Sequence, residues 1–145
     1  MRLAYFLALF LMLGLGAQPA AADQIVGLAG KCLNVSGASS ADGTPIILYR
    51  CEGYDNEEWE FRNGRIIGFG GKCLNVQGNN SANGTPIILY RCHGGPNEMW
   101  RRDGRQIVGL GGKCLNVENE NSADGARIIL WPCENRPNDR WSVRR

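Results

Sequence analysis

The sequence has little of what metal, cofactor or nucleic-acid binding requires. Its formal net charge is +2 at pH 7, whereas a nucleic-acid partner calls for a strong basic excess on one face. It has one histidine, His93, and no Cys-x-x-Cys motif, so a zinc site lacks ligands. No window carries an apolar stripe of helical spacing that is long enough for a helix. We therefore expect no metal, no cofactor, no nucleic-acid partner and no α-helix.

Residues that could carry catalysis are equally sparse. His93 occurs in only one of the three repeats described below, and the even number of cysteines leaves no free thiol nucleophile. Glu57 and Glu58 are adjacent, and neighbours on one strand point to opposite faces, so they form no facing carboxylate pair. We expect that the protein is not an enzyme.

One apolar run is present, and it lies at the N-terminus. Arg2 supplies a positive start, residues 3–15 are almost wholly apolar, and the alanines at 20–22 offer a cleavage site. The run is shorter than the roughly 20 residues that span a bilayer, and no second run follows. The sequence predicts a signal peptide over residues 1–22 and a secreted chain, extracellular or periplasmic, of residues 23–145 without a membrane span.

A threefold repeat fills the secreted chain. Two cysteines and one tryptophan recur at intervals of 41 residues without a gap, and Gly-Lys-Cys-Leu-Asn-Val occurs once in each unit. The recurring positions are Cys32, Cys73 and Cys114, then Cys51, Cys92 and Cys133, then Trp59, Trp100 and Trp141. The predicted units one, two and three are residues 24–64, 65–105 and 106–145.

Each unit predicts four short strands rich in β-branched and aromatic residues. In unit one they cover residues 24–28, 32–35, 46–49 and 58–62, with turns at 40–43 and 63–64. Four strands per unit also suit an open array or a propeller, but a propeller needs four or more blades as a rule. Three units closing on a pseudo-three-fold axis predict an all-β fold, the β-trefoil. The three repeated tryptophans should then meet in one core.

Six cysteines in a secreted chain predict three disulfides. Each unit has one cysteine at its second strand and another 19 residues later, so the repeat predicts the same bridge three times. The predicted pairs are Cys32–Cys51, Cys73–Cys92 and Cys114–Cys133. A loop of this size stabilises the folded chain by about 3 kcal/mol in the chain-entropy model.

The secreted chain resembles the ricin B-type lectin family over its whole length. The resemblance is carried by Gly-Lys-Cys-Leu-Asn-Val, by Asp-Gly-Thr-Pro before Ile-Ile-Leu-Tyr-Arg-Cys, and by a closing Asn-x-x-Trp in each unit. The family closes its units with Gln-x-Trp, whereas this chain has Glu57, Glu98 and Asp139 in the place of Gln. The resemblance implies a carbohydrate-binding module with up to three shallow sites for galactose-type sugars or xylan-like chains.

The resemblance also implies which residues form the sugar pocket of each unit. They are Asn34, Tyr49, Asn56 and Glu57 in unit one, Asn75, Tyr90, Asn97 and Glu98 in unit two, and Asn116, Trp131, Asn138 and Asp139 in unit three. Where the family has an acidic residue on the second strand, this chain has Asn three times. Where the family often has Gln, it has Ile47, Ile88 and Ile129. Because strand side chains alternate, we expect Ile47 to border the pocket and Ile46 and Leu48 to face the core.

Two polar patterns carry further expectations. Asn and the carboxylate stand in exchanged places relative to the family's Asp and Gln, so we expect Asn34 to donate a hydrogen bond to Glu57. The same hypothesis pairs Asn75 with Glu98 and Asn116 with Asp139. The recurring lysines are expected to be turn residues with solvated ends: Lys31, Lys72 and Lys113.

Two functions remain open from the sequence. The aromatic residue and the Asn retained in every unit favour a lectin whose partner is a glycan or polysaccharide. The missing acidic residue and the three isoleucines favour the alternative, a protein-binding or inhibitory trefoil that has lost sugar recognition. A toxin or enzyme partner encoded separately is compatible with either.

Overall fold

The computed structural model describes residues 22–145, so the predicted signal peptide lies outside the described residues apart from Ala22. Unit one contains β1 (Gln24–Val26), β2 (Cys32–Val35), β3 (Thr44–Tyr49) and β4 (Glu60–Arg62). Unit two contains β5 (Arg65–Ile67), β6 (Cys73–Val76), β7 (Ile87–Tyr90) and β8 (Arg101–Asp103). Unit three contains β9 (Gln106–Val108), β10 (Cys114–Val117), β11 (Ala126–Trp131) and β12 (Ser142–Arg144).

Short 3-10 helices join the strands. They are η1 (Leu28–Gly30), η2 (Ser36–Ala38), η3 (Asp55–Glu57), η4 (Phe69–Gly71), η5 (Gln77–Asn79), η6 (Pro96–Glu98), η7 (Leu110–Gly112), η8 (Glu118–Glu120) and η9 (Pro137–Asp139). The sequence did not predict these single turns, because three residues are too few for helical periodicity to show. No helix within residues 22–145 is long and apolar enough to cross a membrane.

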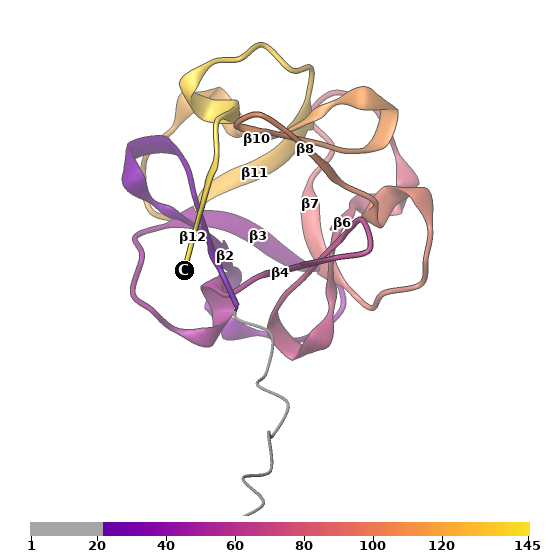
Figure 1. Cartoon of the computed structure of the whole chain (residues 1–145), viewed down its shortest axis with the longest axis horizontal. Helices are drawn as coiled ribbons and strands as arrows, with labels where there is room; N and C mark the ends of the chain where they lie inside the picture. The colour runs from indigo at the N-terminus through magenta and orange to yellow at the C-terminus, as the bar shows by residue number, and fades with distance from the viewer. Residues whose placement is uncertain (1–21) are drawn as a thin grey trace, which may run out of the picture.

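The strands close into three lobes around a central axis (Figure 1). Within each unit the second strand pairs antiparallel with the third, as β2 does with β3. Hairpins β4–β5 and β8–β9 link consecutive units, and β12 pairs with β1, so the last unit closes on the first. Near the axis β3 pairs with both β7 and β11. This arrangement is the β-trefoil that the repeat predicts.

The core gathers the tryptophan of every unit. Trp59, Trp100 and Trp141 are buried together with the inward aliphatic residues of the strands. Each indole Nε1 donates to a leucine carbonyl on the second strand of its own unit at 3.0 Å. A glycine of the next unit lies against each ring, and a Cβ at Gly68 would stand 2.5 Å from Trp59. Gly27 meets Trp141 in the same way, so the core contacts also close the ring of units.

All three predicted disulfides are present. They join Cys32 to Cys51, Cys73 to Cys92 and Cys114 to Cys133. Each bridge ties the buried start of a second strand to the loop that follows the third strand. That loop carries part of the pocket rim described below, so the bridge anchors the rim to the core.

The expectation that the lysines have solvated ends is wrong. Each ammonium reaches the turn of the preceding unit and donates to a serine carbonyl: Lys31 to Ser122, Lys72 to Ser40 and Lys113 to Ser81. At two junctions an aspartate adds an ion pair, with Nζ to Oδ1 distances of 3.0 Å for Lys31–Asp124 and 2.9 Å for Lys72–Asp42. The third junction has Asn83 at that place and therefore lacks the charge.

These ion pairs lower the pKa of the two aspartates. The Lys72 ammonium holds the pKa of Asp42 below its ordinary value of 3.8, and the Lys31 ammonium does the same for Asp124. The backbone N–H groups of Arg91 and Arg50 each donate to one of these carboxylates at 3.0 Å. The lysines are contacts between units, which the sequence could not show because their partners lie in a different repeat.

Candidate functional site

Each unit has an open hollow at its surface, with volumes of about 550, 500 and 480 Å³ in units one, two and three. Each hollow is lined by the second-strand Asn, the isoleucine and aromatic residue of the third strand, and the closing Asn. These are Asn34, Ile47, Tyr49 and Asn56; Asn75, Ile88, Tyr90 and Asn97; and Asn116, Ile129, Trp131 and Asn138. Ile47 borders the hollow, as predicted, while Ile46 and Leu48 are buried in the core.

The two asparagines of a unit form a hydrogen-bonded pair, which we call the pocket floor. In unit one, Asn56 Nδ2 donates to the Val35 carbonyl at 3.1 Å and to Asn34 Oδ1 at 3.2 Å. Because a backbone carbonyl can only accept, it fixes which end of the Asn56 amide faces inward, and Asn34 must then present its oxygen. The corresponding Asn–Asn distances are 3.2 Å in unit two and 3.3 Å in unit three.

This pairing determines what each floor offers a ligand. In unit one it occupies Asn34 Oδ1 and Asn56 Nδ2, so Asn34 Nδ2 stays available as a donor and Asn56 Oδ1 as an acceptor. In unit two, Asn75 is 2% exposed and its Nδ2 has no partner among the described residues. In unit three, Asn138 Oδ1 is also buried and has no partner among the described residues. Buried polar groups without a partner are costly, but these two atoms have almost no accessible surface, so a ligand reaches them only if the side chains shift.

The carboxylate of unit one lies behind the floor, and the predicted hydrogen bond from Asn34 to it is wrong. Glu57 Oε1 accepts instead from the backbone N–H of Glu52 at 2.7 Å, from that of Gly53, and from Gln24 Nε2 at 3.0 Å. Glu57 ends η3 and does not belong to the fourth strand, so its side chain turns inward beneath the loop after the third strand. Its exposed fraction is 0%, which leaves it no surface for a ligand.

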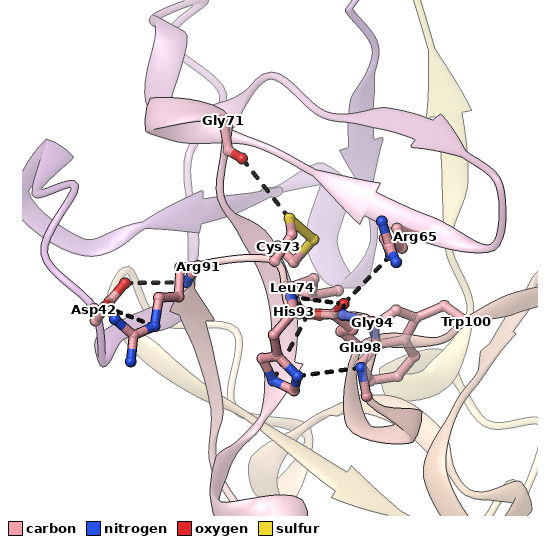
Figure 2. Close-up of a disulfide and its surroundings, with 12 residues drawn as sticks. Asp42, Arg65, Gly71, Cys73, Leu74, Arg91, His93, Gly94, Glu98 and Trp100 are labelled. Carbon is pink, nitrogen blue, oxygen red and sulfur yellow. Dashed lines mark hydrogen bonds and ion pairs between the residues drawn. A yellow bond between two sulfur atoms is a disulfide. The ribbon is translucent and has the colours of Figure 1, made fainter.

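Figure 2 shows the equivalent carboxylate of unit two. Glu98 accepts from the backbone N–H of His93 at 3.0 Å and from that of Gly94, and Arg65 Nε lies 3.3 Å from its Oε1. In unit three, Asp139 accepts from three successive backbone N–H groups of the same loop at 2.8 to 3.0 Å. The predicted donations from Asn75 and Asn116 are therefore wrong as well. Charge-assisted bonds of this kind hold the rim loops in shape.

Three side chains in unit two lie as close together as the ligands of a metal site, but they are not suited to bind a metal. Cys73, Cys92 and Glu98 bring potential ligand atoms close together. The two sulfur atoms are bonded to each other, as Figure 2 shows, and a disulfide offers no thiolate to a metal. Glu98 is already held by the loop above it.

The three hollows differ at their edges, which we call the rims. The rim of unit one carries Glu52, Tyr54, Asp55 and Phe69; that of unit two carries Gln77, Asn79, His93 and Pro96; that of unit three carries Glu118, Asn119, Glu120 and Arg136. In unit three, Arg136 Nε donates to Glu120 Oε1 at 2.7 Å, and this carboxylate raises the pKa of Arg136. Trp131 is 37% exposed, so its ring is open to a ligand.

The sequence reasoning missed the rim residues. Tyr54, Phe69 and Arg136 lie outside the repeated text, and the family resemblance supplied no role for them. A signal for Tyr54 did exist, because it is an aromatic residue in a polar loop where the other units have Gly95 and Arg136. Phe69 could not have been found in this way, since it belongs to unit two in sequence but lines the hollow of unit one.

Comparison with solved structures finds the same fold. The designed three-fold symmetric protein ThreeFoil is 31% identical, with 86% of this chain and 98% of that chain covered and a TM-score of 0.80. The agglutinin from Abrus precatorius is 25% identical over 85% of this chain and 48% of that chain, with a TM-score of 0.75. The earthworm R-type lectin C-half in complex with GalNAc is 19% identical, covers 86% and 98%, and has a TM-score of 0.71.

Among curated proteins, a stretch of 29 residues is 55% identical to the probable lipoprotein EnvE of Salmonella typhimurium. This stretch spans 20% of the present chain and 17% of that protein, so it says nothing of a shared activity. The family model described as the ricin-type beta-trefoil lectin domain matches residues 21–141, which include all three floors. The chain belongs to the ricin-type β-trefoil lectin domain family.

Proposed function

We propose that this protein is a secreted carbohydrate-binding module with one sugar site in each unit and no catalytic activity of its own. The observation that carries the proposal is the threefold recurrence of one constellation: an aromatic ring, an isoleucine and an asparagine pair around an open hollow. Core packing alone does not account for the aromatic ring of this set, because Tyr49 and Tyr90 are partly exposed and Trp131 is exposed.

The chemistry of the hollow suits a sugar ring. The aromatic face packs on the apolar C–H side of a pyranose, while the polar floor meets its hydroxyl groups. In unit one, Asn34 Nδ2 can donate to one hydroxyl and Asn56 Oδ1 can accept from another. Ile47 adds an apolar wall beside Tyr49. The buried carboxylates Glu57, Glu98 and Asp139 take part by holding the loops, without touching the ligand.

Relatives of the same fold support sugar as the ligand class. The earthworm lectin structure is a complex with GalNAc, and that of a bitter gourd protein, with a TM-score of 0.76 and 21% identity, is a complex with α-methyl-D-galactoside. Several relatives are longer: the present chain covers 48% of the Abrus agglutinin and 30% of an exo-β-1,3-galactanase from Clostridium thermocellum. A toxin or enzyme encoded separately would fit this modular use.

The first experiment is a glycan array probed with residues 23–145, purified with the disulfides intact. We expect binding to one class of sugar, and competition by the free sugar. Tyr49→Ala, Tyr90→Ala and Trp131→Ala, made singly and combined, then count the working units. Stepwise loss of binding indicates independent sites, and complete loss from a single substitution indicates one site. A blank array with a folded protein contradicts the proposal and favours the protein-binding alternative.

A further inference from the structure

We propose that unit one binds an uncharged chain of at least two sugar residues, because Tyr54 on its rim and Phe69 at its border extend the pocket into an adjoining second subsite. The inference rests on the proposed function and extends it for one unit only. It identifies unit one as the site for a stretch of oligosaccharide, whereas units two and three lack the aromatic pair that extends the pocket.

Two hollows meet at the edge of unit one. The pocket of about 550 Å³ adjoins a second hollow of about 380 Å³, and both are lined by Asp55 and Phe69. The second hollow lies where η3 and β4 of unit one face β5 and η4 of unit two. Its lining also includes Ala22, which the predicted cleavage would remove. A ligand that fills the pocket therefore has a continuous path across the junction of the two units.

Aromatic side chains mark this path. Tyr49 and Tyr54 both line the pocket, and Phe69 stands between the two hollows. Tyr54 is 64% exposed, although a large aromatic ring gains free energy from burial. Phe69 is partly buried and packs against the core, so its ring is held in place from below. The partly buried ring at the border and the exposed ring on the rim lie in the same hollow as the pocket aromatic, and they offer apolar faces on which successive pyranoses can stack.

The other two units lack this aromatic pair. The residues equivalent to Tyr54 are Gly95 and Arg136, and those equivalent to Phe69 are Leu28 and Leu110. The contact between the 3-10 helices on which the second subsite is built occurs in all three units, as η3 with η4, η6 with η7 and η9 with η1. The backbone platform is therefore common to the repeat, and only unit one places aromatic rings on it.

The charges around the two hollows select among polysaccharides. Four charged residues line them, and all are acidic: Glu52, Asp55, Glu58 and Glu60. Carboxylates accept hydrogen bonds from sugar hydroxyls but repel the carboxylates or sulfates of an anionic polymer. Glu52 and Glu60 are each paired with an arginine, and neither arginine lines the hollows. A chain of uncharged sugars fits this lining, and a polyuronic acid does not.

The test isolates unit one with the double substitution Tyr90→Ala and Trp131→Ala. Calorimetry then compares free monosaccharides with their tetrasaccharides in the galactose, xylose, glucose and N-acetylglucosamine series, and with tetragalacturonate. For the series that binds, we expect the tetrasaccharide to bind more tightly than the monosaccharide. Tyr54→Ala should lower the ratio of tetrasaccharide affinity to monosaccharide affinity about three- to tenfold, which corresponds to the loss of one stacked aromatic ring. Phe69→Leu, which installs the residue of the other units, should lower it in the same direction.

Tyr54→Phe is the matched control, because it keeps the ring and should keep the ratio. A second control isolates unit three with Tyr49→Ala and Tyr90→Ala, and should show no preference for chain length. Equal affinities for mono- and tetrasaccharide in unit one, or tighter binding of tetragalacturonate, would overturn the second subsite. The second subsite is also overturned if the wild type binds the glycan array but the isolated unit one binds no sugar. A blank array for the wild type would instead overturn the proposed function.

Discussion

The pocket floors and the pocket rims of this protein obey different constraints. The floors have the same asparagine pair in every unit, with Asn–Asn hydrogen bonds of 3.2, 3.2 and 3.3 Å. The rims share no such element, since the position of Tyr54 in unit one is Gly95 in unit two and Arg136 in unit three. Groups that pack against a shared core can change only together with their neighbours, whereas exposed rim residues can change singly. The three units therefore share the polar groups of the pocket floor and differ in the side chains around the pocket opening.

The largest difference in stability should appear when one buried and one exposed aromatic side chain are removed from the same unit. Trp59→Ala should lower the free energy of unfolding by about 3–5 kcal/mol, because it empties a core site and removes the hydrogen bond to the Leu33 carbonyl. Tyr54→Ala should change it by no more than about 0.5 kcal/mol. Urea denaturation with the disulfides intact measures both. Similar losses for the two variants would contradict the assignment of Tyr54 to the rim.

The buried carboxylate allows the same comparison with polar residues. Glu57→Gln should lower the free energy of unfolding by about 1–3 kcal/mol, since it weakens charge-assisted bonds from two backbone N–H groups. Its neighbour Glu58 is exposed, so Glu58→Gln serves as the control and should have little effect. Thermal and urea unfolding of both variants measure the difference. If the two substitutions cost the same, Glu57 does not hold the loop.

A substitution in the floor should weaken sugar binding. Asn34→Asp keeps an oxygen for Asn56 but replaces the free N–H₂ donor with an acceptor. We expect the isolated unit one to bind its sugar about tenfold more weakly, which corresponds to the loss of one hydrogen bond. Asn63→Asp makes the same change of charge in an exposed turn and should leave the affinity unchanged. Titration calorimetry of both variants tests the donor role, which unaltered binding by Asn34→Asp would exclude.

The smallest effect concerns the junctions between units. Asn83→Asp should give Lys113 the carboxylate that the other two lysines already have and raise the melting temperature slightly. The partner lysine lowers the pKa of Asp42 and of Asp124 in the folded chain. The stability from each pair is therefore fully present above pH 3.8, the ordinary value, and is lost as the pH falls through the lowered pKa. If Asn83→Asp still raised the melting temperature at a pH below the lowered pKa of the aspartate, the added charge would not be the cause.

The fold, the disulfides and part of the pocket lining could be predicted from the sequence, because each sequence motif occurs three times. One unit with Cys32, Cys51 and Trp59 would have been ambiguous, but three copies at a spacing of 41 residues determine the bridges and the closure. The lining residues Asn34, Ile47 and Tyr49 followed from strand alternation and from the family resemblance. The side-chain partners of the polar residues did not follow, because a hydrogen bond depends on distances that no spacing in the sequence records.

The general plan of the trefoil follows from the order of its residues: three units, four strands in each, one disulfide in each and a shared tryptophan core. The folded chain was needed to establish which asparagine pairs with which, that Glu57 faces backbone N–H groups, and that Lys31 reaches Asp124 in another unit. It was also needed to place Phe69 of unit two at the border of the pocket of unit one. The physical reason is common to all of these. Periodic packing leaves its record along the chain, whereas contacts between units form only when the ring closes.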